Sequence, residues 1–255
     1  MVTDAVPMVR AQSVSRRADN GRGPGLQILR QCSLGIPAGG LTAIVGPSGA
    51  GKTSLLYCLS GLDRPDEGRV IVDGTDVYGL GRERRARFLR TRVGFVFQQY
   101  NLIPYLTVAE NVLLPEELAG RRVPRDAVDR LLARFGLADK RSTPASALSG
   151  GEQQRVALCR AMLLHPAVVF ADEPTGALDT ANSRMVLGVL RDLAGSGTTV
   201  VVVTHDVDAA SLADRVVFMR DGAITGVSGP MKGAAILAAM RTPGAAATTG
   251  GGPSW

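Results

Sequence analysis

The sequence predicts an α/β fold built on a mostly parallel core sheet. Residues 41–45, 167–171 and 199–204 are short apolar runs rich in β-branched side chains, and helical patterns separate them. Continuous apolar runs, as opposed to alternating ones, are typical of parallel strands that are covered on both faces. With 255 residues the chain can bury one large core, or one core with an inserted lobe.

An antiparallel β subdomain is expected before this sheet. Residues 9–40 hold short apolar stretches that glycine-rich turns interrupt, which is a pattern of strands and not of helices. An Asp-Gly turn after residues 69–72 predicts a hairpin, and a second Asp-Gly pair predicts another near the end of the chain. We expect the folded domain to occupy residues 9–241, with flexible ends at residues 1–8 and 242–255.

A phosphate-binding loop follows the first apolar run. Its eight residues fit the pattern G-x-x-x-x-G-K-[ST] and are Gly46, Pro47, Ser48, Gly49, Ala50, Gly51, Lys52 and Thr53. A strand, a glycine turn and the start of a helix bring backbone N–H groups and the positive end of a helix dipole to one anion. Lys52 can then reach the β- and γ-phosphates, and the Thr53 hydroxyl is a hard oxygen ligand for Mg²⁺.

Polar side chains stand at the ends of three predicted strands. Asp172 and Glu173 follow one strand, and His205 follows another. Gln98 ends a third strand. Because ligands bind at the carboxyl ends of the strands in such sheets, we expect these four side chains to lie beside the phosphate loop.

Each of the strand-end acids and the histidine has a chemical use and a plainer alternative. Asp172 could hold Mg²⁺ directly or through a water, and Glu173 could accept a proton from, or orient, a water that attacks the γ-phosphate. His205 could donate to the charge that develops on the phosphate. In the plainer interpretation the two acids cap a turn, and the histidine is a structural hydrogen-bonding group.

A helical lobe is expected between two strands, over about residues 99–165. The pattern turns helical from residue 108 to residue 137. Breaks in the helical pattern are expected at Pro115, Gly120 and Pro124.

The second half of this lobe contains Leu-Ser-Gly-Gly-Glu-Gln-Gln-Arg at residues 148–155. Ser149 and Glu152 fit a capping box that opens a helix. A capped start with Gly150 and Gly151 leaves backbone N–H groups and a helix dipole open to a nearby anion. This second phosphate-binding helix end suggests that two copies of the chain share their nucleotides.

The net charge of +6 comes largely from one segment. Between Arg82 and Arg92 there are six arginines and one glutamate, which supply +5 of it. The sequence therefore does not indicate a chain-wide surface for nucleic acid. The segment is interpreted as a solvated helical face, or as a surface for anionic lipid or an acidic partner.

The cysteine spacing and the hydropathy of the sequence indicate the cellular compartment of the chain. Cys32, Cys58 and Cys159 lie far apart, which favours buried free thiols over a disulfide framework or a metal site. No stretch approaches the ~20 apolar residues that span a bilayer, and the first ten residues lack the apolar core of a signal peptide. We therefore expect a soluble chain that stays in the cytoplasm.

Together these strings resemble the ATP-binding subunit of ATP-binding-cassette (ABC) transporters, in matching order across roughly residues 9–225. The resemblance is carried by residues 46–53, Gln98, residues 148–155, residues 171–174, residues 176–179 and His205. The motif Ala-Asp-Glu-Pro-Thr-Gly-Ala-Leu-Asp at residues 171–179 is most similar to the corresponding sequence in the branch of lipoprotein-releasing, macrolide-exporting and cell-division cassettes.

The resemblance implies the fold of a P-loop NTPase and a head-to-tail homodimer that holds two ATP molecules with Mg²⁺. Each ATP would lie between the phosphate loop of one copy and Ser149, Gly150 and Gly151 of the other. Asp179 would cross the seam between the copies.

The resemblance also implies roles near the reacting phosphate and a membrane partner. Gln98 would sense Mg²⁺, held by Thr53 and Asp172, and would link to the partner. Glu173 would be the catalytic base. The lobe beginning near Tyr100 would receive the coupling element of a separate membrane permease, which places the ATPase at the cytoplasmic face of the cell membrane as a peripheral subunit.

The sequence departs from the family's pattern at the adenine contact. These cassettes usually stack an aromatic side chain on adenine before the phosphate loop, but the first aromatic residue here is Tyr57. Ala18 aligns with the stacking position, and Arg16 or Arg17 could stack by its guanidinium instead. We expect a weakened base contact and loose nucleotide selectivity.

The expected function is ATP hydrolysis that powers a separate permease of an ABC transporter. The alternative is an ABC ATPase that drives a mechanical or signalling membrane complex, as in the cell-division branch. Cassettes that act on nucleic acid or ribosomes carry long coiled coils, zinc-hook cysteines or tandem cassettes, and this sequence has none of them. A GTPase or small-molecule kinase would leave the string at Ser149 unexplained, and the Asn-Lys-x-Asp motif for guanine is absent.

Overall fold

The fold is given by a computed structural model that describes residues 6–18, 25–163, 165–176 and 178–241. The segments expected to be flexible, residues 1–8 and 242–255, lie outside these ranges except for residues 6–8.

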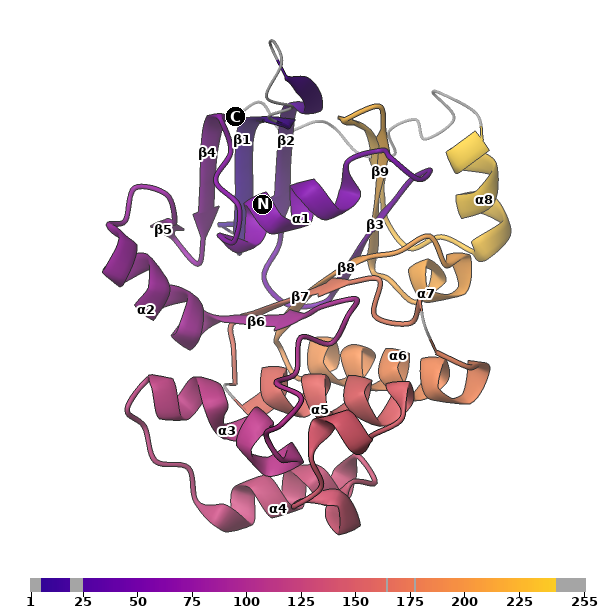
Figure 1. Cartoon of the computed structure of the whole chain (residues 1–255). Coiled ribbons are helices and arrows are strands. Elements are labelled where there is room, and N and C mark those ends of the chain that lie inside the picture. Colours follow the sequence, from indigo (N-terminus) through magenta and orange to yellow (C-terminus); the bar gives the residue numbers. More distant parts are fainter. Residues whose placement is uncertain (1–5, 19–24, 164, 177, 242–255) are drawn as a thin grey trace.

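Ten strands form two sheets in the described part of the chain (Figure 1). The strands are β1 (Val9–Ala18), β2 (Leu26–Ile36), β3 (Leu41–Val45), β4 (Glu67–Val72), β5 (Thr75–Asp76), β6 (Val93–Val96), β7 (Val168–Asp172), β8 (Thr199–Val203), β9 (Arg215–Arg220) and β10 (Ala223–Ser228). The smaller sheet is antiparallel and has the order β2-β1-β4-β5, and the core sheet has the order β10-β9-β3-β8-β7-β6. All neighbours in the core sheet are parallel except β9 and β10, so the predicted mostly parallel core and antiparallel N-terminal subdomain are confirmed.

The helices lie on both faces of the core sheet (Figure 1). They are α1 (Lys52–Ser60), α2 (Arg82–Arg92), α3 (Val108–Leu118), α4 (Arg125–Arg134), α5 (Gly150–Leu163), α6 (Thr180–Gly195), α7 (Val207–Ser211) and α8 (Gly233–Arg241), with short 3-10 turns at Ala138–Lys140 and Ala145–Ala147. Helix α1 lies between the two sheets, where it contacts β1, β2 and β4 on one side and β7 and β8 on the other. Helices α5 and α6 lie beneath the opposite face.

Successive residues of each core strand enter two different hydrophobic clusters. In β7, Val168 and Phe170 pack on the side of α1, whereas Val169 and Ala171 pack on the side of α5 and α6. All five residues of β3, β7 and β8 are buried. Strands covered on both faces need apolar side chains at every position, which explains the uninterrupted apolar runs in the sequence.

Helices α3, α4 and α5 form the predicted lobe between β6 and β7. The break between α3 and α4 spans Gly120 and Pro124 as expected, but the break expected at Pro115 is wrong because α3 continues through it. Proline removes one helical hydrogen bond. Helix α3 tolerates that loss because a capping box of Thr107 and Glu110 starts it and its apolar side packs against α5.

The loop at residues 100–106, which precedes α3, is held by one buried amide. Asn111 is fully buried. Its Oδ1 accepts from the backbone N–H of Ile103 at 2.8 Å, and its Nδ2 donates to the carbonyls of Ile103, Leu106 and Thr107 at 3.1 Å each. A loop fastened in this way is ordered by side chain to backbone bonds in place of regular secondary structure.

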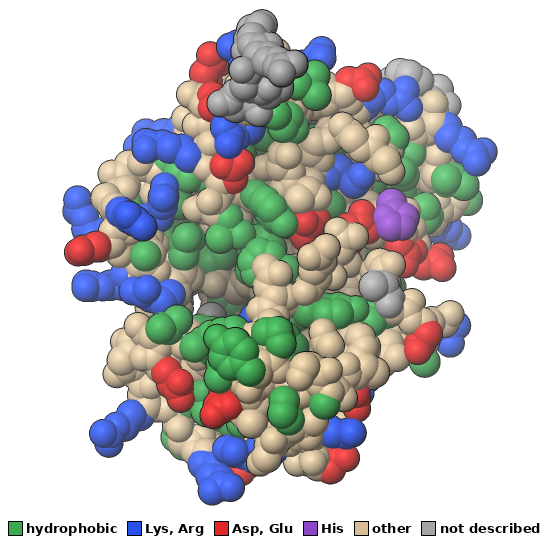
Figure 2. All heavy atoms as spheres, viewed as in Figure 1, with side chains coloured by type: hydrophobic (Ala, Val, Ile, Leu, Met, Phe, Trp, Pro, Cys, Tyr) green, Lys and Arg blue, Asp and Glu red, His purple; other side chains and the backbone are tan. Residues whose placement is uncertain are grey.

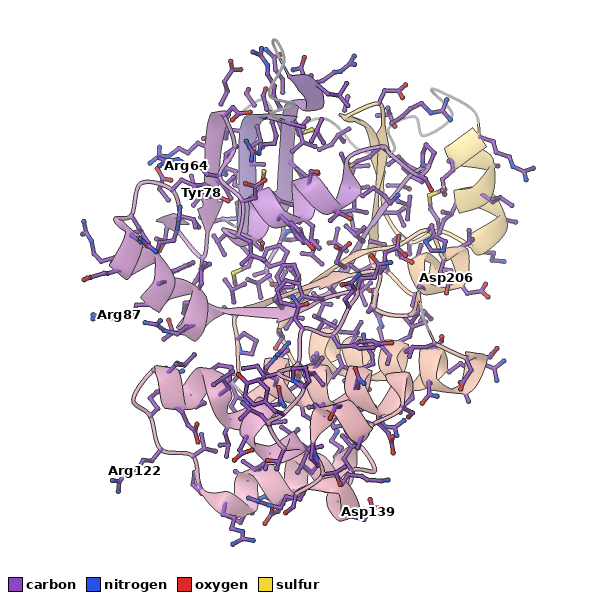
Figure 3. All side chains as sticks on the ribbon, viewed as in Figure 1. Arg64, Tyr78, Arg87, Arg122, Asp139 and Asp206 are labelled. Atoms are coloured by element: carbon purple, nitrogen blue, oxygen red, sulfur yellow. The ribbon has the colours of Figure 1, made fainter. Side chains whose placement is uncertain are left out.

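The arginine-rich segment forms helix α2, which has no buried residue. Arg87 points away from the molecule (Figure 3), and Figure 2 shows a group of basic side chains over this side of the molecule. This placement fits both a solvated helical face and a surface for anionic lipid or an acidic partner, so the choice between them stays open. Cys32, Cys58 and Cys159 are buried free thiols, as expected. Within the described ranges, no helix has both the length and the apolar character that crossing a bilayer requires.

We predict that Asn111→Ala lowers the free energy of unfolding by about 3 kcal/mol, because the substitution leaves buried backbone groups of the loop without partners. Denaturant unfolding followed by circular dichroism measures this loss. The control is Gln99→Ala, an exposed amide in the adjacent turn, which should change stability by less than about 0.5 kcal/mol. A loss below about 1 kcal/mol for Asn111→Ala would show that water replaces the amide.

Candidate functional site

The phosphate loop joins β3 to α1 at the carboxyl edge of the core sheet. Gly51 is the N-cap of α1 and has φ +90°. A Cβ at this position would meet the carbonyl oxygen of Ile28 at 2.9 Å, so both the backbone angle and the close approach require glycine. The loop thus places the first turn of α1, with its free N–H groups, at the edge of the sheet.

Lys52 curls back over the loop that precedes it. Its buried Nζ donates to the carbonyl oxygens of Gly46 and Pro47, both at 3.0 Å. An ammonium group has three donors, so one more remains for an anion held by the loop. The position suits a contact with terminal phosphates.

Thr53 and Asp172 meet across the sheet edge. The Thr53 hydroxyl donates to Oδ1 of Asp172 at 3.0 Å, and Asp172 is only 2% exposed. Burial raises the pKa of Asp172 above its ordinary value, and the nearby charge of Glu173 adds to this, while hydrogen bonds from Thr53 and Tyr57 oppose it. Two hard oxygens side by side are a suitable partial ligand set for Mg²⁺, which takes the remaining ligands from phosphate and water.

No cluster of three or more histidine, cysteine, aspartate or glutamate side chains that could hold a metal occurs among the residues that the structure describes. A metal held by protein side chains alone therefore does not fit this part of the chain. Mg²⁺ that arrives with phosphate oxygens does fit it.

Glu173 and His205 form an ion-pair contact beside the loop. His205 Nδ1 lies 2.6 Å from Glu173 Oε2. A histidine that donates from Nδ1 to a carboxylate can donate from Nε2 as well only when it is protonated. The pair can therefore hold one carboxylate oxygen fixed and present a second ring nitrogen to another group.

The backbone at Glu173 is in the left-handed region. Its φ is +46°, which non-glycine residues rarely adopt. Two hydrogen bonds fix this conformation, from Glu173 N–H to the Val203 carbonyl at 2.9 Å and from Gly176 N–H to the Glu173 carbonyl at 3.1 Å. Strain of this kind is often kept at functional positions, where it aims a side chain.

A cavity of about 230 Å³ lies over the loop. Its lining residues are Ile28, Gly49, Ala50, Gly51, Lys52, Thr53, Ser54 and Glu173. The volume is below the 300–1,000 Å³ typical of complete ligand pockets, so the cavity suits the phosphate end of a nucleotide. Sequence reasoning missed Ile28, because a lone apolar residue in a strand carries no motif.

Gln98 lies at the same edge, but within the described residues it makes no hydrogen bond to the other site residues. Strand β6 ends at Val96, two residues earlier than expected, and Gln98 is exposed in the turn that follows. Val96 is paired with Ala171, so Gln98 stands one strand away from Asp172. Its role as a sensor of Mg²⁺ stays a prediction.

Ser149, Gly150 and Gly151 stand outside this cavity, at the start of α5. The predicted capping box is confirmed, since Glu152 N–H donates to Ser149 Oγ at 3.4 Å and Ser149 N–H donates to Glu152 Oε2 at 2.8 Å. The exposed start of α5 is therefore open to a group that another molecule supplies.

Asp179 is tied to the start of α5 through Asn182. The Asp179 carboxylate accepts from the backbone N–H and from the side-chain amide of Asn182, each at 2.8 Å, and Arg155 Nη1 donates to Asn182 Oδ1 at 2.7 Å. A Cβ on Gly151 would lie 2.9 Å from the Asn182 side chain, so a larger residue there would displace Asn182. Asn182 was not found from the sequence, because a helical asparagine carries no motif.

One of the two arginines proposed for the adenine contact is bound within its own chain. All three guanidinium nitrogens of Arg16 donate to Asp63 and Asp66 at 3.0 Å, so this side chain is engaged on the loop after α1. Arg17 is exposed, and Ala18 offers no ring. Ile28 supplies an apolar side chain beside Gly51.

Comparison with known proteins assigns the family. The sequence matches the ABC transporter family over residues 29–176, which is more than half of the chain. It is 43% identical to the macrolide export ATP-binding/permease protein MacB of Nitrosomonas europaea, over 87% of this chain and 34% of that protein. It is 42% identical to the lipoprotein-releasing system ATP-binding protein LolD of Porphyromonas gingivalis, over 77% of this chain and 91% of LolD. The chain thus spans about a third of the MacB relatives and nearly all of LolD.

A solved structure has the same fold. The ATP-binding cassette MJ0796, in a dimeric post-hydrolysis state bound to ADP and phosphate, superposes with a TM-score of 0.82 at 35% identity. The match covers 88% of this chain and 99% of that one. This chain belongs to the ABC transporter family, and its fold is that of the ABC ATPase cassette.

Proposed function

We propose that this chain binds and hydrolyses ATP and that the hydrolysis powers a membrane permease. The observation that carries the proposal is the cavity in which Lys52, Thr53 and Glu173 converge, with Asp172 bound to Thr53. A phosphate loop alone would support binding only. A carboxylate placed in the same cavity also supports hydrolysis.

In this proposal each residue acts on a different part of the triphosphate. Lys52 and the N–H groups of the loop neutralise the terminal phosphates, and Glu173 orients or deprotonates the attacking water. His205 donates to the charge that develops on the γ-phosphate. Mg²⁺ bound near Thr53 and Asp172, with Gln98 close to it, would neutralise phosphate charge.

We further infer that two copies form a head-to-tail dimer. Ser149, Gly150 and Asp179 are exposed, Gly151 is half-buried, and all four lie outside the cavity of their own chain, so they can complete the site of a second copy. The dimeric state of the MJ0796 cassette supports this arrangement.

The loop at residues 100–106 is the proposed docking surface for the permease. Tyr105 within it is 80% exposed, so a large aromatic side chain is available for a partner to cover. LolD is named as the ATP-binding protein of a lipoprotein-releasing system, and MacB as an ATP-binding/permease protein for macrolide export. Both names favour transport over a purely mechanical or signalling role. The chain would then lie at the cytoplasmic face of the cell membrane, held there by its permease.

We predict that Glu173→Gln lowers ATP hydrolysis by roughly 10²-fold and traps ATP in a dimer, because glutamine keeps the shape of the side chain but cannot take the proton. Phosphate release measures the rate, and sedimentation with ATP and Mg²⁺ measures the dimer. Lys52→Ala is the contrasting variant, since losing the phosphate contact should abolish both hydrolysis and the ATP-dependent dimer. Near-normal turnover in Glu173→Gln would remove Glu173 from its proposed role.

We predict that Asp172→Asn raises the melting temperature of the nucleotide-free protein at pH 7. Because the pKa of Asp172 is raised in the folded state, its ionised form costs stability above that pKa, and this cost vanishes as the pH falls toward the unfolded value. The gain should therefore shrink on acidification from pH 7 to pH 4, and the stabilisation by ATP with Mg²⁺ should be lost.

Thermal unfolding across this pH range, with and without ATP and Mg²⁺, measures both effects. Asp139→Asn is the matched control, because Asp139 is an exposed carboxylate that points out of the helical lobe (Figure 3). A lower melting temperature for Asp172→Asn at pH 7 would contradict the electrostatic argument.

We predict that Tyr105→Asp abolishes co-purification of the chain with an integral membrane protein from detergent-solubilised source membranes, while the ATPase rate of the isolated chain stays unchanged. A charged group placed in an apolar contact must be desolvated, which costs binding energy. Leu118→Asp, at another exposed apolar position, is the control that should keep the partner. Equal recovery of the membrane protein with Tyr105→Asp would rule out this loop as the docking surface.

A further inference from the structure

Arg160 of helix α5 binds the loop that follows Gln98. Its Nη1 donates to the carbonyl oxygen of Asn101 at 2.6 Å, and its Nη2 donates to that of Tyr100 at 2.8 Å. The two short bonds from one guanidinium group fasten two consecutive peptide units to α5. The loop held in this way is the one that carries the exposed Tyr105.

The two residues that Arg160 holds have an unusual backbone. Tyr100 has φ +58° and Asn101 has φ +48°, and consecutive left-handed residues other than glycine are uncommon. Such a conformation persists only where the surroundings fix it. The planar fork of a guanidinium group can hold two carbonyls at once, which a lysine ammonium cannot do with the same geometry.

Arg160 makes no ion pair within the described ranges of the chain. Burial lowers the pKa of Arg160, although a guanidinium group stays protonated in proteins. A partly buried cation without a carboxylate is a costly way to stabilise a fold. This favours a role in fixing the position of the loop over a role in stability alone.

Tyr100 connects the same loop to the start of α5. A Cβ placed on Gly150 would lie 3.1 Å from the Tyr100 hydroxyl oxygen, so the tyrosine ring reaches the first residue of the helix. Its carbonyl meanwhile is held by the guanidinium group of Arg160, whose Cα lies about 15 Å further along α5. The second half of the loop is held separately. Asn111 binds Ile103 and Leu106, and the N–H groups of Ala145 and Ser146 donate to the carbonyls of Leu106 and Pro104 at 2.9 and 3.0 Å. Arg160 therefore fastens the first half of the loop, residues 100–102, to α5.

We propose that Arg160 is a positioning residue that fastens residues 100–102, the first half of this loop, to helix α5, so that a displacement of this segment moves Ser149–Gly151 and the reverse. The inference rests on the proposed function, in which the loop meets a permease and the start of α5 meets the nucleotide of a second copy. It adds the physical link between those two surfaces within one chain.

The test uses hydrogen exchange in the full chain with Glu173→Gln, where ATP and Mg²⁺ are expected to produce a stable dimer. With Arg160 present, ATP should slow exchange at residues 149–153 and also at residues 100–102, each by about tenfold, because the two segments open together. With Arg160→Gln added, residues 149–153 should remain slowed about tenfold, and residues 100–102 should change by less than about twofold.

Arg130→Gln in the same background is the matched control. Arg130 is an exposed arginine of the same lobe whose ion pair is with Asp126 of its own helix, so both segments should respond as with Arg160 present. A merely structural role of Arg160 would lower the melting temperature but leave the response of the two segments to ATP coupled.

Each outcome decides between the alternatives. Equal slowing of both segments in Arg160→Gln overturns the link. If Arg160→Gln does not fold, Arg160→Lys carries the same comparison, and failure of both variants to fold overturns the proposal by making Arg160 a residue of stability alone. Absence of an ATP-dependent dimer in Glu173→Gln with Arg160 intact contradicts the proposed function itself, which separates the two failures.

Discussion

The site depends on one geometric constraint, which is that the parallel strands β3, β8 and β7 end at the same edge of the core sheet. Thr53 and Asp172 are 119 residues apart in the sequence, yet their side chains meet at 3.0 Å. Strand β8 lies between β3 and β7 and brings His205 to Glu173 in the same way. Side chains placed on rigid strand ends are held more closely than side chains on free loops, and phosphate chemistry requires this precision.

Two residues at the same edge of the core sheet destabilise the fold. Asp172 is a carboxylate buried at 2% exposure with a raised pKa, and Glu173 occupies a left-handed conformation that costs roughly 1–2 kcal/mol for a non-glycine residue. The two clusters of apolar side chains on the faces of the core sheet offset these costs. An acid in such a place gains from a bound cation, so the strain and the proposed Mg²⁺ site are two aspects of one arrangement.

Most of the fold and most of the proposed ATP site could be predicted from the sequence, because both depend on residues that lie close together in the chain. Apolar runs locate the strands, the glycine string locates the phosphate loop, and the capping box at Ser149 locates the start of α5. The expected break at Pro115 was wrong, since packing of α3 on α5 outweighs one lost hydrogen bond. The helix propensity of single residues decides where a helix ends only where tertiary contacts are weak.

The residues that were not predicted from the sequence were missed for one physical reason. Asn111, Asn182 and Arg160 act by side chain bonds to backbone or to other polar groups that only the folded path of the chain brings near. Such bonds depend on position in three dimensions and leave no periodic or string-like signal. Arg16 is the converse case, because its guanidinium group was a candidate for stacking on the base, and only the fold shows that Asp63 and Asp66 bind it. Bonds in the plane of the guanidinium do not cover the face that stacks, so its contact with the base stays a prediction.

Two of these residues act at the proposed surfaces of the helical lobe. Asn182 joins Asp179 to Arg155, and Arg160 joins the start of the loop with Tyr105 to α5. Apolar side chains of the lobe pack in one continuous cluster with those of β3, β7 and β8, and a closely packed interior transmits displacement. In the proposed dimer the lobe carries both the permease surface and the contact with the second ATP, so a change at either one is transmitted through packed side chains to the other.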